Sequence, residues 1–380
     1  MALFNRSLLS SFLDHKPPKV LVIFGPRRVG KTTLLQQSAV SHSVTWYTGD
    51  SLTDVKALNI PSTDDLRNLL LQGKALVIDE AQRVPDIGLL LKRLVDINVT
   101  LENPVMILAT GSSSFELASG VKESALGRIK QRQMWPLSTK ELAENSSWAK
   151  AVQNVGWHMI YGMYPKICTH PECAQESLRD HCNGWLFKDI YSLGRIRHCD
   201  KFEKLVQYLA LNIGSLISYD RVSREIGLNK NTVADYIELL EQCFIVKVCP
   251  SYAKKLPAEL TKSKKIYFCD NGIRNAVIGD FSPISNRSDA GALWENFVYT
   301  ERMKLHAFNN DFAKIYFWRT SGRRPGQLAF VEVVDGKMTA IDCKMSKDEI
   351  ASPRGAFVAA YPECSIHSIC PQDVMNLWTI

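Results

Sequence analysis

A lysine and two glycines near the start of the chain have the spacing of a loop that binds phosphate. The loop matches G-x-x-x-x-G-K-[ST], and its residues are Gly25, Pro26, Arg27, Arg28, Val29, Gly30, Lys31 and Thr32. It follows an apolar run at 20–24, which predicts a buried parallel strand, and it precedes a helical stretch that includes Thr33. Glycines let backbone N–H groups face phosphate oxygens, and the helix adds the positive end of its dipole. The loop and Thr33 are therefore predicted to bind ATP, with Lys31 on the β- and γ-phosphates and Thr32 on Mg²⁺.

Two adjacent acids supply the other half of this predicted site. Residues 75–78 form a second buried-strand run, which ends in Asp79 and Glu80. An acid at the carboxyl end of a parallel strand lies in the crevice where ligands bind. We expect Asp79 to hold the Mg²⁺ shell and Glu80 to orient and polarise the attacking water. One acid after a strand is often only a helix N-cap, but two acids at this place favour ATP hydrolysis.

Three further polar residues each have two predicted roles. A third buried strand at 105–109 is followed by Thr110 and Ser112. Their hydroxyls are predicted either to sense the γ-phosphate or to cap a helix or turn. Arg128 is predicted either to pair with a surface carboxylate or to act as a charge-stabilising finger in catalysis. If Arg128 acts on a neighbouring copy of the chain, the protein is a homo-oligomer.

Hydrophobic periodicity predicts a helical module over residues 201–275. Residues 202–213 place apolar side chains on one helical face, and Gly227 closes a second helix that Ser218 can cap. A third helix is expected to begin after Asn229. Its inward-facing residues are predicted to be Val233, Tyr236, Ile237 and Leu240.

A lysine-rich loop between strand-like runs at 244–249 and 266–268 completes a pattern typical of a winged helix. Such a module can bind DNA with the start of the third helix in the major groove and the loop on phosphates. The residues predicted to contact DNA are Lys230, Asn231, Thr232, Lys254 and Lys255. Acidic residues at 235, 238 and 241 lie on the same helix and would repel phosphate. A module that only packs between domains is therefore the alternative.

The C-terminal part of the chain contains a hairpin signal. Asp335-Gly336 predicts a two-residue turn that pairs residue 334 with 337 and residue 332 with 339. Glu332 then lies on one face of the hairpin. The opposite face is predicted to carry Gln327, Ala329, Val331, Ala340, Asp342 and Lys344.

These motifs together resemble the AAA-family ATPases of bacteria and archaea that are fused to a C-terminal domain of uncharacterised function. The resemblance rests on GPRRVGKT, LVIDEAQ, ATGSSS and GR…PLS, and it continues through 162–165, 188–190, 265–268 and 293–297. It therefore covers nearly the whole chain. It implies an oligomerising P-loop ATPase with a helical lid, a winged helix and a restriction-endonuclease-like fold.

Resemblance to restriction-endonuclease-like nucleases also implies a metal site, which this chain carries in altered form. The nuclease pattern is a helix Glu, a hairpin Asp and an acid-x-Lys, in which two carboxylates grip Mg²⁺ and the lysine positions water. Glu295 matches the helix acid, and Asp342 and Lys344 match the acid-x-Lys, but the hairpin Asp is replaced by Ala329. Loss of the central carboxylate weakens a divalent site. We therefore expect a degenerate nuclease site in which Asp342 and Lys344 pair with each other.

Length, charge and hydrophobic patterning indicate a multidomain protein without a transmembrane helix. The chain has 380 residues with 46 Lys+Arg against 39 Asp+Glu, so its net charge is +7. This length predicts two or three domains, and the mild basic excess permits contact with nucleic acid without requiring it. No apolar run approaches the roughly 18 residues of a membrane helix, and the N-terminus does not have the pattern of a signal peptide. We expect a cytoplasmic protein with no membrane partner.

The ten cysteines are expected to be reduced thiols in that compartment. One group has residue types that can bind zinc: Cys168, His170, Cys173, His181, Cys182, His198 and Cys199. Its spacing does not match a paired C-x-x-C pattern, so thiols scattered along a helical segment are the alternative.

The predicted fold is α/β, and it has four parts. They are an AAA-type P-loop NTPase core with a parallel sheet and flanking helices at 1–142, a helical lid or linker at 143–200, an all-α winged helix at 201–275 and an α/β restriction-endonuclease-like domain at 276–380. The predicted function is Mg²⁺-dependent ATP hydrolysis that acts on the two C-terminal modules and is coupled to DNA. The alternative is a nucleotide-gated regulator or scaffold that acts on an unknown protein partner without DNA.

Overall fold

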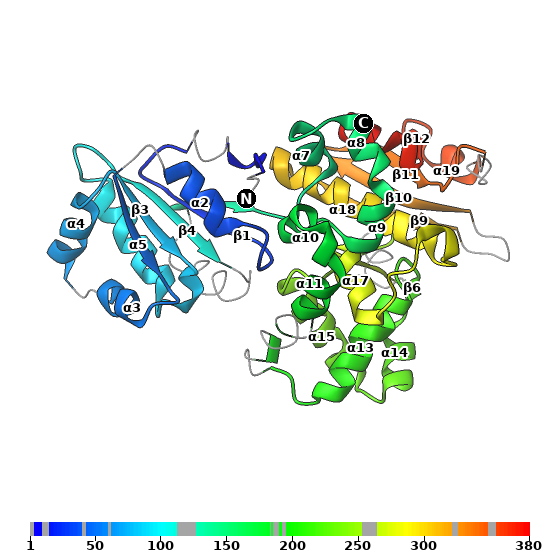
Figure 1. Cartoon of the computed structure of the whole chain (residues 1–380), viewed down its shortest axis with the longest axis horizontal. Helices are drawn as coiled ribbons and strands as arrows, with labels where there is room; N and C mark the ends of the chain where they lie inside the picture. Colours follow the sequence, from blue (N-terminus) through cyan, green and yellow to red (C-terminus); the bar gives the residue numbers. More distant parts are fainter. Residues whose placement is uncertain are drawn as a thin grey trace. The chain divides into compact units, whose positions relative to one another are not determined.

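The computed structural model of the chain divides into two compact units (Figure 1). The N-terminal unit is Asn5–Pro136, and the C-terminal unit is Leu137–Ile380 together with Met1–Phe4. The structure describes residues 4–9, 15–39, 43–59, 62–111, 127–182, 184, 190–191, 195–252, 264–320, 326–348 and 355–380. Within these ranges, no helix combines the length and the apolar character that crossing a bilayer requires.

The N-terminal unit is built on a sheet of five parallel strands in its described part. The strand order is β2-β3-β4-β1-β5. The strands are β1 (Val20–Phe24), β2 (Val44–Thr48), β3 (Ala75–Asp79), β4 (Met106–Gly111) and β5 (Ile129–Gln133). The helices between them are α2 (Lys31–Ala39), α3 (Leu52–Leu58), α4 (Thr63–Leu71) and α5 (Ile87–Asn98), with a short 3₁₀ turn η1 (Ala81–Arg83). The three predicted buried strands are confirmed.

Burial on both faces explains why these strands read as continuous apolar runs. Every residue of β1 and of β3 is buried, as expected for central strands of a sheet that is covered on both sides. The strand β4 lies between β1 and β3, with Phe24 opposite Gly111 and Ile78 opposite Ala109. Because all the strands are parallel, the loops that follow β1, β3 and β4 leave the sheet at one edge.

The C-terminal unit begins with a run of short helices. They are α7 (Thr139–Glu144), α8 (Trp148–Gln153), α9 (Val155–Tyr161), α10 (Pro165–Thr169) and α11 (Ala174–His181). Ser138 starts α7 with a capping box, in which its hydroxyl accepts from the Glu141 N–H and the Glu141 carboxylate accepts from the Ser138 N–H. The prediction of a mostly helical segment here is confirmed for the described residues.

Three helices and a small antiparallel sheet follow in the order expected from periodicity. They are α13 (Cys199–Leu211), α14 (Tyr219–Ile226), α15 (Lys230–Gln242), β6 (Leu216–Ile217), β7 (Val246–Cys249) and β8 (Lys264–Phe268). The strand order is β6-β8-β7. The four residues of α15 that were predicted to face inward are all buried. As predicted, α14 ends at Gly227, which has the left-handed conformation with φ 72°.

The last part of the C-terminal unit is a four-stranded sheet with a long helix. The elements are α17 (Asn271–Ile278), α18 (Ala290–Asn309), β9 (Lys314–Arg319), β10 (Gln327–Val334), β11 (Lys337–Cys343), α19 (Gly355–Ala360), β12 (Ser365–Ile369) and η5 (Pro371–Trp378). The predicted hairpin is confirmed, because Glu332 pairs with Thr339 and Val334 with Lys337. Asp335 and Gly336 both have positive φ, as a type I′ turn requires.

The predicted position of Ala329 on the hairpin is wrong. A bulge in β10 leaves Leu328 opposite Trp318 and Val331 opposite Tyr316, so one extra residue is inserted between them. The extra residue reverses the alternation of side chains along the strand. Ala329 therefore packs in the core cluster that includes residues of α18, whereas Val331 lies in the cluster on the other face.

Gly162 allows α9 to end against a buried carboxylate. A Cβ atom at this position would lie 1.9 Å from Asp270 Oδ1, and the glycine has φ +73°. Asp270 cannot move aside freely, because it accepts hydrogen bonds from the Met163 N–H at 2.8 Å and the Ile273 N–H at 3.2 Å.

Gly162→Ala is expected to lower the thermal midpoint of the protein, since backbone strain and the lost hydrogen bonds together cost about 2 kcal/mol or more. Gly156→Ala in the same helix is the matched control. A Cβ there meets nothing within 4 Å, so this change should raise stability by about 0.5 kcal/mol. Thermal unfolding of both variants checks the prediction, and equal midpoints would contradict it.

Candidate functional site

Three elements of the N-terminal unit meet at the carboxylate of Asp79. The Thr32 hydroxyl, at the start of α2, donates to Asp79 Oδ2 at 2.8 Å. The Thr110 hydroxyl, on β4, donates to Asp79 Oδ1. The Thr110 oxygen also accepts from the Glu80 N–H at 3.1 Å. The residues predicted for the nucleotide, the metal and the water are therefore brought together at one edge of the sheet.

The phosphate loop follows β1 and has the backbone that its glycines predict. Gly30 has φ +95° and Arg28 has φ +64°. A Cβ on Gly25 would lie 2.0 Å from the Met134 carbonyl oxygen, so only glycine fits at the start of the loop. The α2 helix begins at Lys31, and its first turn carries no acidic residue that would offset the positive end of the dipole. Thr33 is exposed on this first turn.

The ammonium of Lys31 is buried under the loop. Its Nζ atom donates to the carbonyls of Gly25 at 2.9 Å and Pro26 at 2.8 Å. Burial lowers the pKa of Lys31 to about 8, and the nearby carboxylates of Glu80 and Asp79 oppose this shift. A buried cation on the inner side of a loop is suited to a phosphate group, which would restore a pKa closer to the ordinary value.

Glu80 is held in a strained backbone conformation immediately after Asp79. It has φ 47° and ψ 42°, in the left-handed region that non-glycine residues rarely adopt. The Gln82 amide donates to Glu80 Oε2 at 2.5 Å. Gly49, after β2, makes room for this turn, because a Cβ there would lie 2.3 Å from the Glu80 carbonyl oxygen. Strained residues of this kind cluster at functional sites.

Arg6 is a residue of the site that the sequence motifs missed. Its guanidinium donates to the Val29 carbonyl at 2.7 Å and to the Trp135 carbonyl at 2.7 Å, and the side chain is buried. It therefore fixes the phosphate loop from a segment that precedes β1 and places a permanent positive charge beside it. No spacing rule links Arg6 to the loop, so nothing in the sequence pattern identifies it.

Arg128 is not part of this cluster within one chain. It precedes β5, and its carbonyl accepts from the N–H of Val20, the first residue of β1. It therefore lies at the amino edge of the sheet, about 16 Å along the strand from the loop. Its side chain pairs with Asp96 at 2.6 Å, as one of its two predicted roles describes. Ser112 lies outside the described residues.

The residues predicted for a nuclease site are divided between two ion pairs. Glu295 on α18 accepts from Lys265 Nζ at 2.7 Å and from the Tyr267 hydroxyl at 2.6 Å. Asp342 pairs with Lys344 at 3.6 Å, as predicted. In the ranges that the structure describes, no group of three His, Cys, Asp or Glu side chains is placed to hold a metal ion.

Cys182 and His181, from the cysteine-rich segment, face the protein core. The Cys182 thiol donates to the Ile273 carbonyl at 3.8 Å, and burial raises its pKa to about 12. The His181 ring packs against Tyr164 with 4.7 Å between centroids. These contacts are those of packed core side chains.

The predicted DNA-contacting residues of α15 lie at its exposed start. Asn229 caps the helix by accepting from the Asn231 N–H at 2.8 Å. Lys230 and Asn231 are exposed and Thr232 is half-buried. The Lys230 ammonium pairs with Asp220 of α14 at 2.9 Å. Lys254 and Lys255 lie outside the described residues.

Two family models match parts of the chain. Residues 17–143 match an AAA domain, and residues 153–283 match a domain of unknown function (DUF8612). The first match coincides with the parallel sheet and the loop at its carboxyl edge. The N-terminal unit is thus similar to AAA domains.

Relatives of the chain are known by sequence. Uncharacterised proteins of Mycobacterium bovis and Mycobacterium tuberculosis are each 26% identical over 314 residues, which cover 80% of this chain and 66% of theirs. An uncharacterised protein of Methanocaldococcus jannaschii is 23% identical, with 78% and 69% covered. This chain thus spans just under two thirds of the mycobacterial relatives.

Solved structures show more distant similarity. A Walker-type ATPase of Pyrococcus abyssi aligns with a TM-score of 0.47 and 15% identity over 73% of this chain and 96% of that one. A signal-transduction ATPase with a tetratricopeptide-repeat sensor from Pyrococcus horikoshii aligns with a TM-score of 0.29 and 13% identity over 80% of this chain and 47% of that one.

Replacing Thr110 with valine keeps the shape of the side chain and removes the hydroxyl that links Asp79 to Glu80. We expect ATP turnover to fall about tenfold or more, because a hydrogen bond to a charged group contributes about 1.5–3 kcal/mol. Thr110→Ser keeps the hydroxyl and should retain most of the turnover. Phosphate release at saturating Mg²⁺ and ATP measures both, and full turnover in Thr110→Val would contradict the link.

ADP binding is expected to weaken as pH rises above about 8. In the free protein Lys31 loses its proton near that pH, whereas phosphate favours the protonated form, so binding must take up a proton at higher pH. Calorimetry in two buffers of different ionisation enthalpy measures this uptake between pH 7 and pH 9.5. Lys31→Arg stays charged throughout and should show no uptake, and an uptake of zero in the unchanged protein would refute the assignment.

Proposed function

We propose that the chain is a Mg²⁺-dependent ATP hydrolase whose nucleotide state acts on the C-terminal unit and is coupled to DNA. The observation that carries the ATPase proposal is the link from Thr32 through Asp79 and Thr110 to Glu80. It places a hydroxyl and a carboxylate together at the loop, and it fixes the backbone of a second acid beside them. Such a set suits hydrolysis better than nucleotide storage.

The donor set fits magnesium that is shared with a nucleotide. Mg²⁺ is usually held by one or two carboxylates together with phosphates and waters rather than by an all-protein cage. Thr32 and Asp79 are the residues that would hold it. When bound, the ion would help neutralise the negative charge of the phosphate groups.

The remaining roles fall to the chain's own groups. The loop N–H groups and the start of α2 would bind the phosphates, and Lys31 would neutralise the β- and γ-phosphates. Glu80 would orient a water, with its carboxylate held by the Gln82 amide. Arg6 would keep the loop in place through its hydrogen bond to the Val29 carbonyl.

Arg128 would serve a neighbouring copy of the chain. Its side chain is about one-third exposed and lies at the edge of the sheet away from the loop. A homo-oligomer could present it to the nucleotide of the next copy, where a guanidinium stabilises transferring phosphate. In a steady-state hydrolysis assay we expect Arg128→Ala to lose turnover and keep nucleotide binding, and full turnover in this variant would contradict the role.

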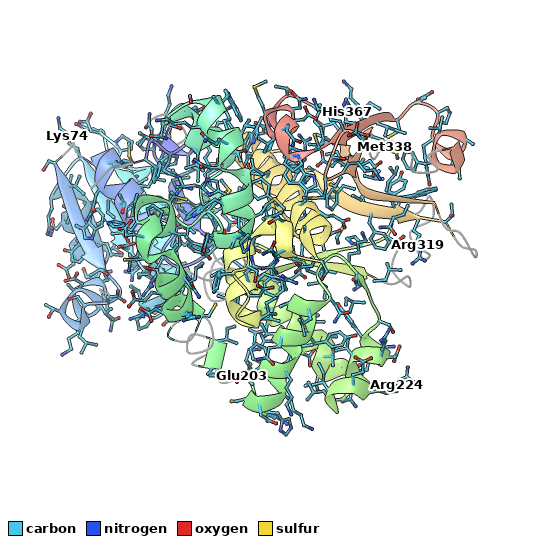
Figure 2. All side chains as sticks on the ribbon, turned by 45° about the vertical axis from the view of Figure 1, so that its right-hand side comes forward. Lys74, Glu203, Arg224, Arg319, Met338 and His367 are labelled. Carbon is cyan, nitrogen blue, oxygen red and sulfur yellow. The ribbon has the colours of Figure 1, made fainter. Side chains whose placement is uncertain are left out.

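Features of the C-terminal unit support DNA as the coupled partner. The helices α13 to α15 and the strands β6 to β8 have the order of a winged helix, with the start of α15 exposed. Two exposed arginines of the same unit, Arg224 on α14 and Arg319 at the end of β9, point outward (Figure 2). Glu241 was one of the acidic residues expected to repel phosphate. Its carboxylate accepts a hydrogen bond from the Val248 N–H at 2.9 Å.

One observation favours the second candidate, a nucleotide-gated regulator with a protein partner. The ammonium of Lys230 is paired with Asp220, so the end of α15 that would enter a groove already has its charge matched. A winged helix of this kind can serve as a packing module. We also propose that the chain has the four predicted parts and that the last of them is a degenerate restriction-endonuclease-like domain.

Steady-state ATP hydrolysis with and without single- and double-stranded DNA tests the proposal. Lys31→Ala and Glu80→Gln are the blanks, and both should lose turnover. No Mg²⁺-dependent turnover in the unchanged protein would refute the ATPase assignment. Stimulation by DNA that fades with added salt is expected, because phosphate contacts release counterions.

Lys230→Ala tests the proposed coupling to DNA separately from ATP hydrolysis. It should lower stimulation by DNA and leave basal turnover unchanged, whereas Lys166→Ala, at an exposed lysine of α10, should change neither. If DNA alters turnover in none of these proteins, the protein-partner regulator is the better assignment.

A further inference from the structure

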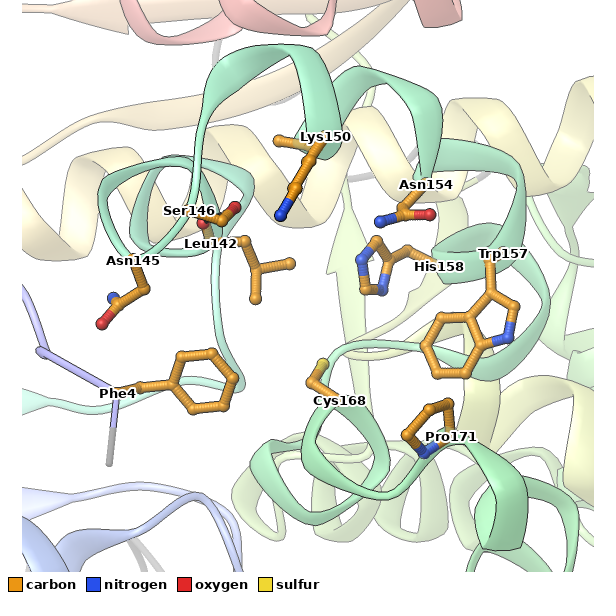
Figure 3. A pocket seen from close by; sticks show the side chains of 11 residues that line it. Phe4, Leu142, Asn145, Ser146, Lys150, Asn154, Trp157, His158, Cys168 and Pro171 are labelled. Atoms are coloured by element: carbon orange, nitrogen blue, oxygen red, sulfur yellow. Dashed lines mark hydrogen bonds between the residues drawn. The ribbon is translucent and has the colours of Figure 1, made fainter. Parts of the chain in front are cut away.

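The short helices at the start of the C-terminal unit surround a pocket that the proposed function does not use. The pocket has a volume of about 300 Å³ (Figure 3). It is lined by residues of α7 to α9 and of the segment from α10 to Pro171, and Phe4 completes it. A volume of this size lies at the lower end of the range for small-molecule sites. The pocket therefore suits a compact ligand and not a folded partner.

The walls of the pocket are of two kinds. Phe4, Leu142 and Trp157 supply apolar surface, and Lys150 and Asn154 supply polar groups. In Figure 3 the Lys150 ammonium and the Asn154 amide both point into the space above Cys168. Apolar surface combined with convergent polar groups is usual for a ligand site.

Trp157 is a rigid aromatic surface. Its ring packs at 5.0 Å from that of Tyr161 and at 5.1 Å from that of His158. Tyr161 is in turn stacked on Phe281, with 5.6 Å between centroids and 9° between planes. An aromatic side chain that is already fixed by its neighbours loses little entropy when a ligand packs against it.

Lys150 carries the single formal charge among the described residues of the lining. Within the described ranges it forms no ion pair with a carboxylate. His158 is neutral at pH 7, because burial lowers its pKa to about 4. His158 Nδ1 lies 3.2 Å from the Gly162 carbonyl oxygen, to which it donates. The pocket therefore presents one positive charge beside an aromatic wall.

We infer that this pocket binds a small aromatic anion. The ring of the ligand packs against Trp157, and its anionic group accepts hydrogen bonds from Lys150 and Asn154. A carboxylate satisfies both hydrogen bonds, because it is planar and can accept from two donors. The same ring with a neutral substituent keeps the apolar contact and loses the attraction to the ammonium.

Binding of two matched probes to the full chain tests the inference. Naphthalene-2-carboxylate carries the charge, and 2-naphthalenemethanol has the same ring and no charge. In a ligand-observed NMR titration we expect the carboxylate to bind up to about fivefold more tightly, since a partly exposed ion pair contributes up to about 1 kcal/mol. Equal affinity for the two probes, or binding of neither at millimolar concentration, would overturn the inference.

Two lysine variants test whether the preference for the carboxylate probe over the alcohol arises in the pocket. Lys150→Met keeps the length of an exposed side chain and removes its charge, so the preference for the carboxylate should disappear while the alcohol binds as before. Lys166→Met removes an exposed charge from α10 outside the lining and should keep the preference. A preference that survives in Lys150→Met would show that the carboxylate binds elsewhere. Neither readout depends on ATP hydrolysis.

Discussion

Asp79 accepts hydrogen bonds from two hydroxyls that reach it from different elements, and the geometry of the candidate site follows from this. Thr32 brings the start of α2, and Thr110 brings the end of β4 together with the Glu80 N–H. The arrangement is possible because β4 lies between β1 and β3 in the parallel sheet. A buried carboxylate without donors would be costly, so the same requirement that satisfies Asp79 also positions the groups around it.

Buried charge pairs play the corresponding part in the C-terminal unit. Arg302 of α18 pairs with Glu332 of β10 at 2.6 Å, and both side chains are buried. Buried Lys265 of β8 pairs at 2.7 Å with Glu295 of α18, which is partly exposed. Removing one member of such a pair costs about 3–5 kcal/mol, because the other charge stays buried. These pairs hold α18 to two sheets.

The parts of the site that could be predicted are those whose chemistry is local. The loop and its lysine are contiguous, and Asp79 and Glu80 directly end an apolar strand. The hairpin register was predictable for the same reason, because Asp335 and Gly336 fix the turn between the two strands. The side on which Ala329 lies was not, because it depends on how β10 pairs with β9 through a bulge.

By itself, the sequence determined the phosphate loop, the two acids, the buried strands and the inward face of α15, since each depends on spacing within a few residues. Only the tertiary structure decided that Arg6 supports the loop, that Arg128 lies at the far edge of the sheet and that Lys265 neutralises Glu295. Each of these contacts joins residues far apart in the chain. Such pairings are set by strand order and helix packing, which no local pattern encodes.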